Sequence, residues 1–219
     1  MNTPLINVHT HHPEEAGLSI RNIIWPQESI TPSFEFVSLG IHPWYIPKDW
    51  EMQLDRMKEH VHNLHVVAIG EAGLDKVCPT PLPLQMEVFK AQVQLAETTQ
   101  KPLIIHCVKA YQEILQIKQQ QTPTMPWILH GYNKKPELAR QLIQKGLLLS
   151  FGKDLLFKPS VQESFRVCPE GSYFLETDDQ DGLFLQDLYE KAALLRKIPM
   201  EKLAENIYLR FCKIFKRSL

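Results

Sequence analysis

The sequence predicts an α/β protein, a short and distorted (β/α)8 TIM barrel formed by a single domain over residues 1–219. Three observations predict this class. Eight short apolar segments follow one another along the chain, and most end in a polar or chemically active residue. Helical patterns lie between most of them, and strands that alternate with helices form a parallel sheet. The length suits one domain with a sizeable core, and eight strands in one domain favour a closed barrel over an open sheet.

The predicted strands are short and strongly apolar. They span residues 5–11, 19–25, 35–42, 65–72, 102–107, 126–131, 146–152 and 173–178. Runs such as VVAI at 66–69 and LII at 103–105 are continuously apolar rather than alternating. This pattern is typical of strands that are buried on both faces, as in a parallel sheet covered by helices.

The predicted helices span residues 49–62, 84–100, 111–120, 136–145, 183–197 and 200–216. In the second of these, Val88, Ala91 and Leu95 recur at helical spacing. Gly146 follows the fourth and provides a helix stop. The connections after the first two strands are short for a crossover helix, so we expect reduced or missing helices near the N-terminal strands.

Composition excludes several classes of protein. The chain has 24 Lys and Arg against 25 Asp and Glu, so its net charge of −1 lacks the basic signature of many nucleic-acid binders. The cysteines are scattered, which excludes a disulfide framework and a thiolate zinc site and indicates free thiols in a reducing cytosol. No apolar run approaches the length of a membrane span, and the first residues do not resemble a signal peptide. We therefore expect a cytoplasmic protein without a membrane partner.

Histidines and carboxylates gather where barrel enzymes build their sites, at the carboxyl ends of the strands. His9 and His11 form an H-x-H pair in the first strand, and side chains two apart on a strand point the same way. The other candidates end four further predicted strands: Glu71, His106, His130 and Asp178. Four imidazoles and two carboxylates suit zinc or another borderline divalent metal. Six ligands suit two ions that share a bridging carboxylate.

Each candidate alone has a simpler interpretation. His106 could be a strand-end histidine with a hydrogen-bond partner, and Glu71 could be a helix cap or a salt-bridge partner. Asp178, beside Asp179 and Asp181, could belong to an acidic loop. The convergence favours the metal interpretation, because several histidines at the ends of buried strands are hard to satisfy without cations.

The sequence contains no motif for a competing nucleophile. It has no G-x-S-x-G, no Gly-rich phosphate loop and no G-x-G-x-x-G. A metal-activated water is then the natural nucleophile. His42 ends the third predicted strand, where it could contact substrate or phosphate or serve only as a structural strand-end residue.

Ordered motifs over nearly the whole chain resemble the TatD-like metal-dependent hydrolases of the amidohydrolase superfamily. They are the opening H-x-H, LGIHP at 39–43, IGEAGLD at 69–75, QMEVFKAQ at 85–92, KPLIIH at 101–106, ILHG at 128–131, LSFG at 149–152, LETD at 175–178 and NIYLRF at 206–211.

The resemblance implies a binuclear hydrolase on a distorted (β/α)8 barrel. His9, His11 and Asp178 would bind one ion, His106 and His130 the other, and Glu71 would bridge them. The predicted catalytic residues are Asp178, as general base, and Glu71. Several family members are deoxyribonucleases, some of them 3′ to 5′ exonucleases, and deacylation of D-aminoacyl-tRNA is also associated with the family. The metal is zinc, manganese, magnesium or nickel, since such ligand sets overlap.

The substrate-facing positions depart from the family pattern. Asn7 stands where the family has an acidic residue, and an amide cannot supply that charge behind a metal-bound histidine. The arginine that the family often has shortly after the histidine of the fifth strand is missing. Lys109 lies nearby in the sequence and can act as a point charge, but it cannot form the two parallel hydrogen bonds of an arginine. Trp44 replaces a second histidine after His-Pro. We expect an intact metal centre with an altered substrate rim.

Three functions remain open from the sequence. The first is a phosphodiesterase acting on DNA ends, with His42, Trp44, Lys109 and Lys134 as predicted substrate contacts. The second is hydrolysis of a small ester or amide, or of a D-aminoacyl-tRNA ester, which the near-neutral charge and the missing arginine favour slightly. The third is a non-enzymatic descendant, against which the intact ligand set argues. Nothing in the sequence indicates an obligate protein partner.

Overall fold

The computed structural model describes residues 3–12, 17–31 and 35–216. Its strands are β1 (Ile6–Thr10), β2 (Leu18–Ile24), β3 (Phe36–Gly40), β4 (Val66–Asp75), β5 (Leu103–Val108), β6 (Trp127–Leu129), β7 (Leu147–Phe151) and β8 (Tyr173–Leu175). They stand in the sheet in their order along the chain, and the pairs β3–β4, β4–β5 and β7–β8 are parallel. This is the strand order of the predicted (β/α)8 class.

The helices alternate with the strands from β3 onward. They are the short 3-10 helix η1 (Pro43–Tyr45), α1 (Trp50–His60), α2 (Leu82–Thr99), α3 (Tyr111–Gln121), α4 (Pro136–Gln144), α5 (Asp154–Phe157), α6 (Pro159–Val167), α7 (Leu185–Arg196) and α8 (Met200–Phe215). No helix occurs among the described residues between β1 and β2 or between β2 and β3. The expected reduction of helices near the start of the chain is therefore confirmed for that part.

The chain divides into two compact units. One comprises residues 1–20 and 129–219, and the other comprises residues 21–128. We call them the terminal unit and the central unit. The single domain expected from the sequence stays a prediction. None of the helices in the described ranges combines the length and the apolar composition that crossing a bilayer requires.

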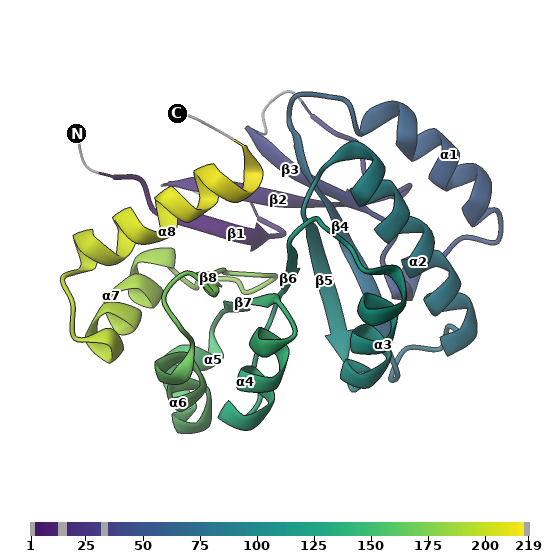
Figure 1. Ribbon diagram of the computed structural model, residues 1–219. Coiled ribbons are helices and arrows are strands. Elements are labelled where there is room, and N and C mark those ends of the chain that lie inside the picture. Colours follow the sequence, from purple (N-terminus) through teal and green to yellow (C-terminus); the bar gives the residue numbers. More distant parts are fainter. Residues whose placement is uncertain (1–2, 13–16, 32–34, 217–219) are drawn as a thin grey trace. The chain divides into compact units, whose positions relative to one another are not determined.

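The central unit is built around β4, which is buried along its whole length. Helices α2 and α3 lie along β4 and β5 (Figure 1). The face of α2 toward the sheet carries Val88, Phe89 and Val93, which solvent does not reach. Burial of these side chains stabilises the unit by about 1.5–3 kcal/mol for each side chain.

The terminal unit brings β1 beside β8, although about 160 residues separate them along the chain. The main chain of Thr10 forms a parallel bridge with Asp178, and the buried Tyr189 hydroxyl of α7 hydrogen-bonds both the N–H and the C=O of Ile6 at 2.9 and 3.0 Å. Helix α8 contacts β1, and α4 contacts β7 (Figure 1). The strand that carries the H-x-H pair is thus fixed to the end of β8.

Several sequence predictions need correction. Glu71 lies inside β4, not at its end, because β4 continues to Asp75 through a register shift between Ile69 and Ala72. At Gly73, φ is +158°, and a Cβ there would collide with the His106 carbonyl, so only glycine fits this passage. The eighth strand ends at Leu175, which leaves Asp178 in the segment that follows. His106 likewise lies inside β5, and His42 and His130 follow the ends of β3 and β6. Helices α5 and α6 were not predicted.

Candidate metal centre

Among the described residues, two groups of side chains that could hold a metal ion each lie within one unit. In the terminal unit the group is His9, His130 and Asp178, and in the central unit it is His42, Glu71 and His106. Within each group, one ligand atom per residue lies within 4.8 Å of the others. Ligands of one ion, at bonds of about 2.0–2.2 Å, lie roughly 3–4 Å apart. Both groups therefore have the chemistry and nearly the spacing that a divalent ion requires.

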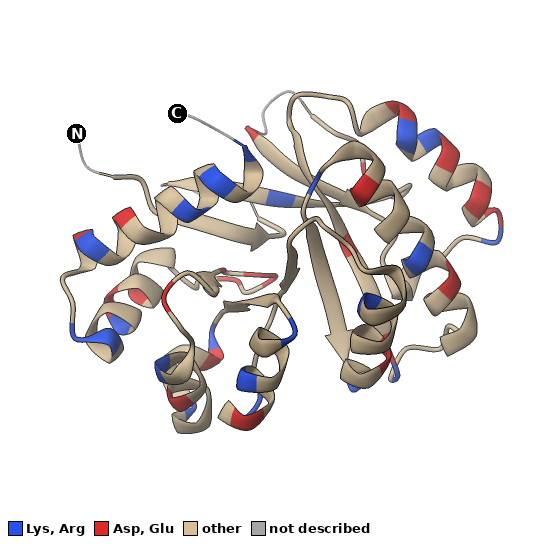
Figure 2. Ribbon diagram, in the orientation of Figure 1, with Lys and Arg blue, Asp and Glu red and all other residues tan. Residues whose placement is uncertain are grey.

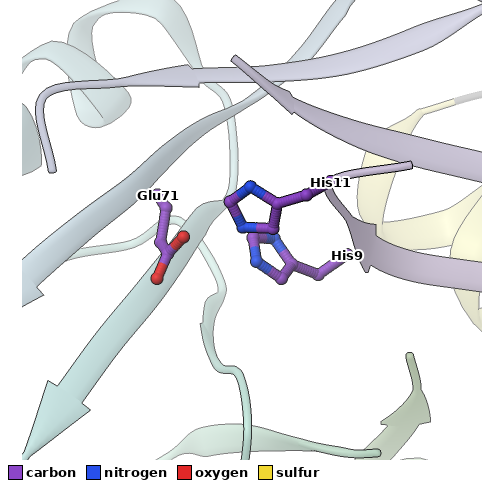
Figure 3. Close-up of side chains that lie close together, drawn as sticks. All are labelled: His9, His11 and Glu71. Carbon is purple, nitrogen blue, oxygen red and sulfur yellow. The ribbon is translucent and has the colours of Figure 1, made fainter. Parts of the chain in front are cut away.

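The terminal-unit group is centred on Asp178. His9 Nε2 lies 3.5 Å and His11 Nε2 lies 3.8 Å from Asp178 Oδ1. The rings of His9 and His11 lie edge to face with centroids 5.2 Å apart, as the H-x-H spacing predicts, and both are drawn in Figure 3. The ring of His130, which the resemblance assigns to the second ion, lies 4.3 Å from that of His9.

The main chain of β1 holds Asp178 in an unusual conformation. Its φ is +56°, in the left-handed region that non-glycine residues rarely adopt. Its N–H donates to the His9 carbonyl at 3.1 Å, and its carbonyl accepts from the N–H of His11 at 2.9 Å. The backbone that carries the two histidines therefore also sets the position of the carboxylate.

The central-unit group is centred on Glu71, the carboxylate drawn on β4 in Figure 3. Its Oε1 lies 2.7 Å from His106 Nδ1 and 3.3 Å from His42 Nε2. Its Oε2 accepts from the Asn22 amide at 3.2 Å, and the Asn22 carbonyl oxygen accepts from the Glu71 N–H at 2.8 Å. Asn22 thus orients Glu71 toward the two imidazoles.

His106 lies between two carboxylates. Opposite Glu71, its Nε2 is 3.0 Å from Asp75 Oδ2, which also accepts from the Trp44 indole at 2.7 Å. Burial alone would raise the pKa of Asp75, but hydrogen bonds from Trp44 and His106 and the N–H of Val77 outweigh it and lower the pKa. The carboxylate is therefore charged and suited to hold the Nε2 proton of His106, which leaves Nδ1 for a metal.

Glu176 lies beside His130. It is fully buried, and its Oε1 accepts from the N–H of Gly131 at 2.5 Å and lies 3.6 Å from His130 Nδ1. Sequence reasoning cited Glu176, Asp75 and Gly131 only within family motifs and missed their contacts. For Glu176 the sequence carries a weak signal, because it stands two residues before Asp178 and residues two apart on a strand point to the same side.

The predicted substrate contacts have different surroundings. His42 belongs to the Glu71 group, and its Nδ1 accepts from the N–H of Trp44 at 3.2 Å. Trp44 has 45% of its surface exposed. Lys109 follows β5 and Lys134 precedes α4, and both are exposed. The structure brings the first two together and gives no ligand role to the lysines.

A polar cavity of about 180 Å³ opens beside Asp178 within the terminal unit. Its lining includes Asn133, Lys153 and Gln180, and Lys153 Nζ donates to Gln180 Oε1 at 3.1 Å. The cavity gives a substrate group polar access to Asp178.

Comparisons with known proteins agree with the sequence motifs. A family model described as TatD related DNase matches residues 17–216. An uncharacterized metal-dependent hydrolase of Buchnera aphidicola is 29% identical over 195 residues, 82% of this chain and 73% of that protein. The human 3′-5′ RNA nuclease TATDN2 is 33% identical over 107 residues, which are 48% of this chain and 14% of that protein.

Solved structures show the same fold. The crystal structure of YJJV, a TatD homologue from Escherichia coli, matches over 100% of both chains with a TM-score of 0.87 and 19% identity. This likeness confirms the predicted distorted (β/α)8 fold.

Proposed function

We propose, from the premise that this chain belongs to the TatD-related DNase family of metal-dependent hydrolases, that it cleaves phosphodiester bonds at the ends of DNA. One observation carries the proposal. Each of the two units has a group of imidazole and carboxylate side chains that could hold an ion, His9–His130–Asp178 and His42–Glu71–His106. Two ions suit displacement at phosphorus, where both the attacking and the leaving oxygen need stabilisation.

The proposed centre would hold one divalent ion at each group, with Glu71 as the carboxylate ligand of the central-unit group and His11 as a further ligand beside Asp178. When bound, the ions supply Lewis-acid polarisation of the scissile bond and lower the pKa of water. Asp178 accepts the proton of the attacking water at its carboxylate. His42 belongs to the Glu71 group. Lys109 contacts the phosphate, Lys134 contacts the backbone, and Trp44 offers its exposed surface to a base.

Two considerations support a nucleic-acid substrate. A human relative that aligns with 48% of this chain, over 14% of its own length, is named a 3′-5′ RNA nuclease. The half-exposed Trp44 is two residues after His42 in the sequence. A base stacked on Trp44 would therefore place its phosphate near the Glu71 group. RNA ends are therefore tested beside DNA ends.

A small ester or amide is the second candidate substrate. The cavity of about 180 Å³ beside Asp178 favours it, because nucleotide-sized ligands fill larger sites. The net charge of −1 also provides little general attraction for a polyanion. D-aminoacyl-tRNA combines such an ester with a nucleic acid.

The deciding experiment measures hydrolysis by metal-reconstituted protein. End-labelled single- and double-stranded DNA, RNA, a small phosphodiester and a small ester are compared in parallel. Asp178→Asn should lower turnover by about 10²–10⁴-fold, because the amide cannot accept the proton. Circular dichroism of the variant checks that it folds.

Shortening of DNA that needs both metal and Asp178 supports the proposal. Hydrolysis of the small ester alone, with nucleic acids intact, moves the assignment to the second candidate. Equal turnover of Asp178→Asn and the wild type rejects Asp178 as the general base.

A further inference from the structure

Trp44 is half-exposed, and its indole N–H contacts the buried Asp75 next to His106. It lies in η1, directly after the loop that carries His42, and 45% of its surface is exposed. Its indole N–H points inward and donates to Asp75 Oδ2 at 2.7 Å. A tryptophan needs no such bond at a half-exposed position, since water would satisfy the N–H.

Asp75 contacts both Trp44 and His106 through the same carboxylate oxygen. The same Oδ2 lies 3.0 Å from His106 Nε2, and Asp75 Oδ1 accepts from the N–H of Val77 at 2.7 Å. The main chain of Asp75 is fixed as well, because the buried Gln85 accepts from its N–H at 2.7 Å and donates to its carbonyl at 2.9 Å. The Asp75 carboxylate thus connects the indole N–H of Trp44 with His106, and both its oxygens accept hydrogen bonds.

The far side of His106 faces Glu71. His106 Nδ1 lies 2.7 Å from Glu71 Oε1. A histidine that presents Nδ1 to an ion must carry its proton on Nε2, and a carboxylate at Nε2 fixes that tautomer. The contacts therefore run from the solvent-exposed indole through Asp75 to the metal-facing nitrogen.

We propose that Trp44 is a positioning residue for His106, acting through Asp75, in addition to any contact with substrate. The proposal rests on the proposed function in one respect, because it takes His106 as a metal ligand. The indole N–H holds the carboxylate in the orientation that fixes the ring and the tautomer of His106. Because about half of the Trp44 surface is exposed, a stacked substrate and a bound ion would act on the same side chain.

Metal binding tests the proposal without substrate. Zn²⁺ is titrated into the metal-free protein against a competing chromophoric chelator. Trp44→Phe keeps an aromatic ring but loses the N–H, and it should weaken the binding of one ion about tenfold. In the activity assay the same variant should lower kcat and leave KM nearly unchanged, because the ring face remains.

Trp25→Phe is the matched control. Trp25 also donates its indole N–H, to the Gln53 carbonyl at 2.8 Å, and Gln53 belongs to neither ligand group. This variant loses the same kind of bond in the same unit, so its zinc affinity should equal that of the wild type. Denaturation curves of both variants establish that each is folded during the titration.

A double-mutant cycle separates positioning from general destabilisation. Asp75→Asn should weaken zinc binding at least as much as Trp44→Phe, and the double variant should be no weaker than Asp75→Asn alone. Additive losses, or wild-type affinity in Trp44→Phe, would overturn the proposal while the metal centre stands. A wild-type protein that binds no Zn²⁺ would overturn the proposed function together with this inference.

Discussion

Asn7 shows how one buried amide supports the catalytic candidate. It lies in β1 with no exposed surface, and its Nδ2 donates to Thr177 Oγ1 at 2.7 Å. Its Oδ1 accepts from the N–H of Thr177 at 3.1 Å. Thr177 directly precedes Asp178, whose left-handed backbone needs support from its neighbours. The amide that departs from the family pattern therefore acts on the turn that presents Asp178.

Asn7→Ala should destabilise the protein by about 1–3 kcal/mol, because it leaves the buried N–H of Thr177 without its acceptor. Urea denaturation followed by circular dichroism measures the change. Asn7→Asp keeps an acceptor at the same place and should recover part of the loss. An unchanged urea midpoint in Asn7→Ala would show that Thr177 does not depend on this residue.

The residues that the sequence identifies and those it misses differ in kind. His106 and Glu71 were predicted because charged or metal-binding side chains in apolar strands stand out in the pattern. Asp75 and Asn22 were missed, because their role depends on which nitrogen or oxygen of a neighbour faces them. That choice follows from side-chain orientation in the folded chain, which spacing along one strand does not determine.

At the scale of elements, α2 connects the sheet to the loops that bear the site. Gln85 and Gln92 are seven residues apart, which is two helical turns, so they share one buried face. Gln92 accepts from the N–H of Ile41 at 2.7 Å and donates to its carbonyl at 3.0 Å, directly before His42. Gln85 does the same for Asp75. One helix face thus fixes the ends of β3 and β4.

Gln92→Leu should destabilise the protein by roughly 2–4 kcal/mol, since it leaves two buried main-chain groups of Ile41 without partners. Gln94→Leu, at an exposed position of the same helix, should change the stability by about 0.5 kcal/mol or less. Equilibrium unfolding of both variants gives the comparison. Equal losses in the two variants would contradict the proposed role of Gln92 in holding the main chain of Ile41.

The C-terminal part of α2 carries a pH-dependent contact. Glu97 accepts from the N–H and the hydroxyl of Thr124 at 3.0 and 2.6 Å, and from the N–H of Met125 at 2.8 Å. Burial alone would raise the pKa of Glu97, but these hydrogen bonds outweigh it and lower the pKa below 4.5. The contact ties α2 to the segment that leads into β6.

When folding lowers the pKa of a carboxyl group, the ionised group stabilises the folded protein at pH values above its unfolded-state pKa. This stabilisation is lost as the pH falls through its folded-state pKa. Glu97→Gln should therefore be less stable than the wild type at neutral pH, and the difference should shrink as the pH falls from about 5 to 3. Glu87→Gln, exposed on the same helix, serves as the control. A difference that is constant over this range would exclude the ionised carboxylate as its cause.

Helices α5 and α6 show where periodicity is insufficient. Helix α5 has four residues, and α6 begins at Pro159 only one residue after α5 ends. A window long enough to detect helical periodicity therefore includes two helices with different axes. Pro159 at the first position, followed by Val161, Ser164 and Phe165 on the buried side, was the available signal.

At the scale of the whole molecule, charge is distributed without a dominant sign. Basic and acidic residues alternate along helices such as α1 (Figure 2), and the net charge is −1. Recognition of a polyanion would then depend on the metal ions and a few residues around the site rather than on a positive electrostatic potential of the whole protein. The strand order was predictable because apolar runs and helical periods recur over the entire chain. The place of His130 beside His9 was not predicted, since the two are 121 residues apart in sequence and the resemblance assigns His130 to the other ion.

Metal should stabilise the folded chain as a whole, because the unfolded chain does not assemble either ligand group. At a free concentration 100 times its Kd, one ion adds about 2.7 kcal/mol, which for a chain of this size raises Tm by roughly 5–10 °C. Removal of metal by a chelator should reverse the shift. His62→Gln, an exposed position outside both groups, should respond like the wild type.

Variants that remove one histidine from each group show how many ions the protein binds. His130→Gln and His106→Gln should each keep part of the thermal shift, and the double variant should lose nearly all of it, because each residue belongs to a different group. Differential scanning calorimetry with and without Zn²⁺ gives the shifts, and bound zinc per chain gives the stoichiometry. If either single variant loses the whole response, the two groups do not hold ions independently, and a single shared site replaces the two-ion centre.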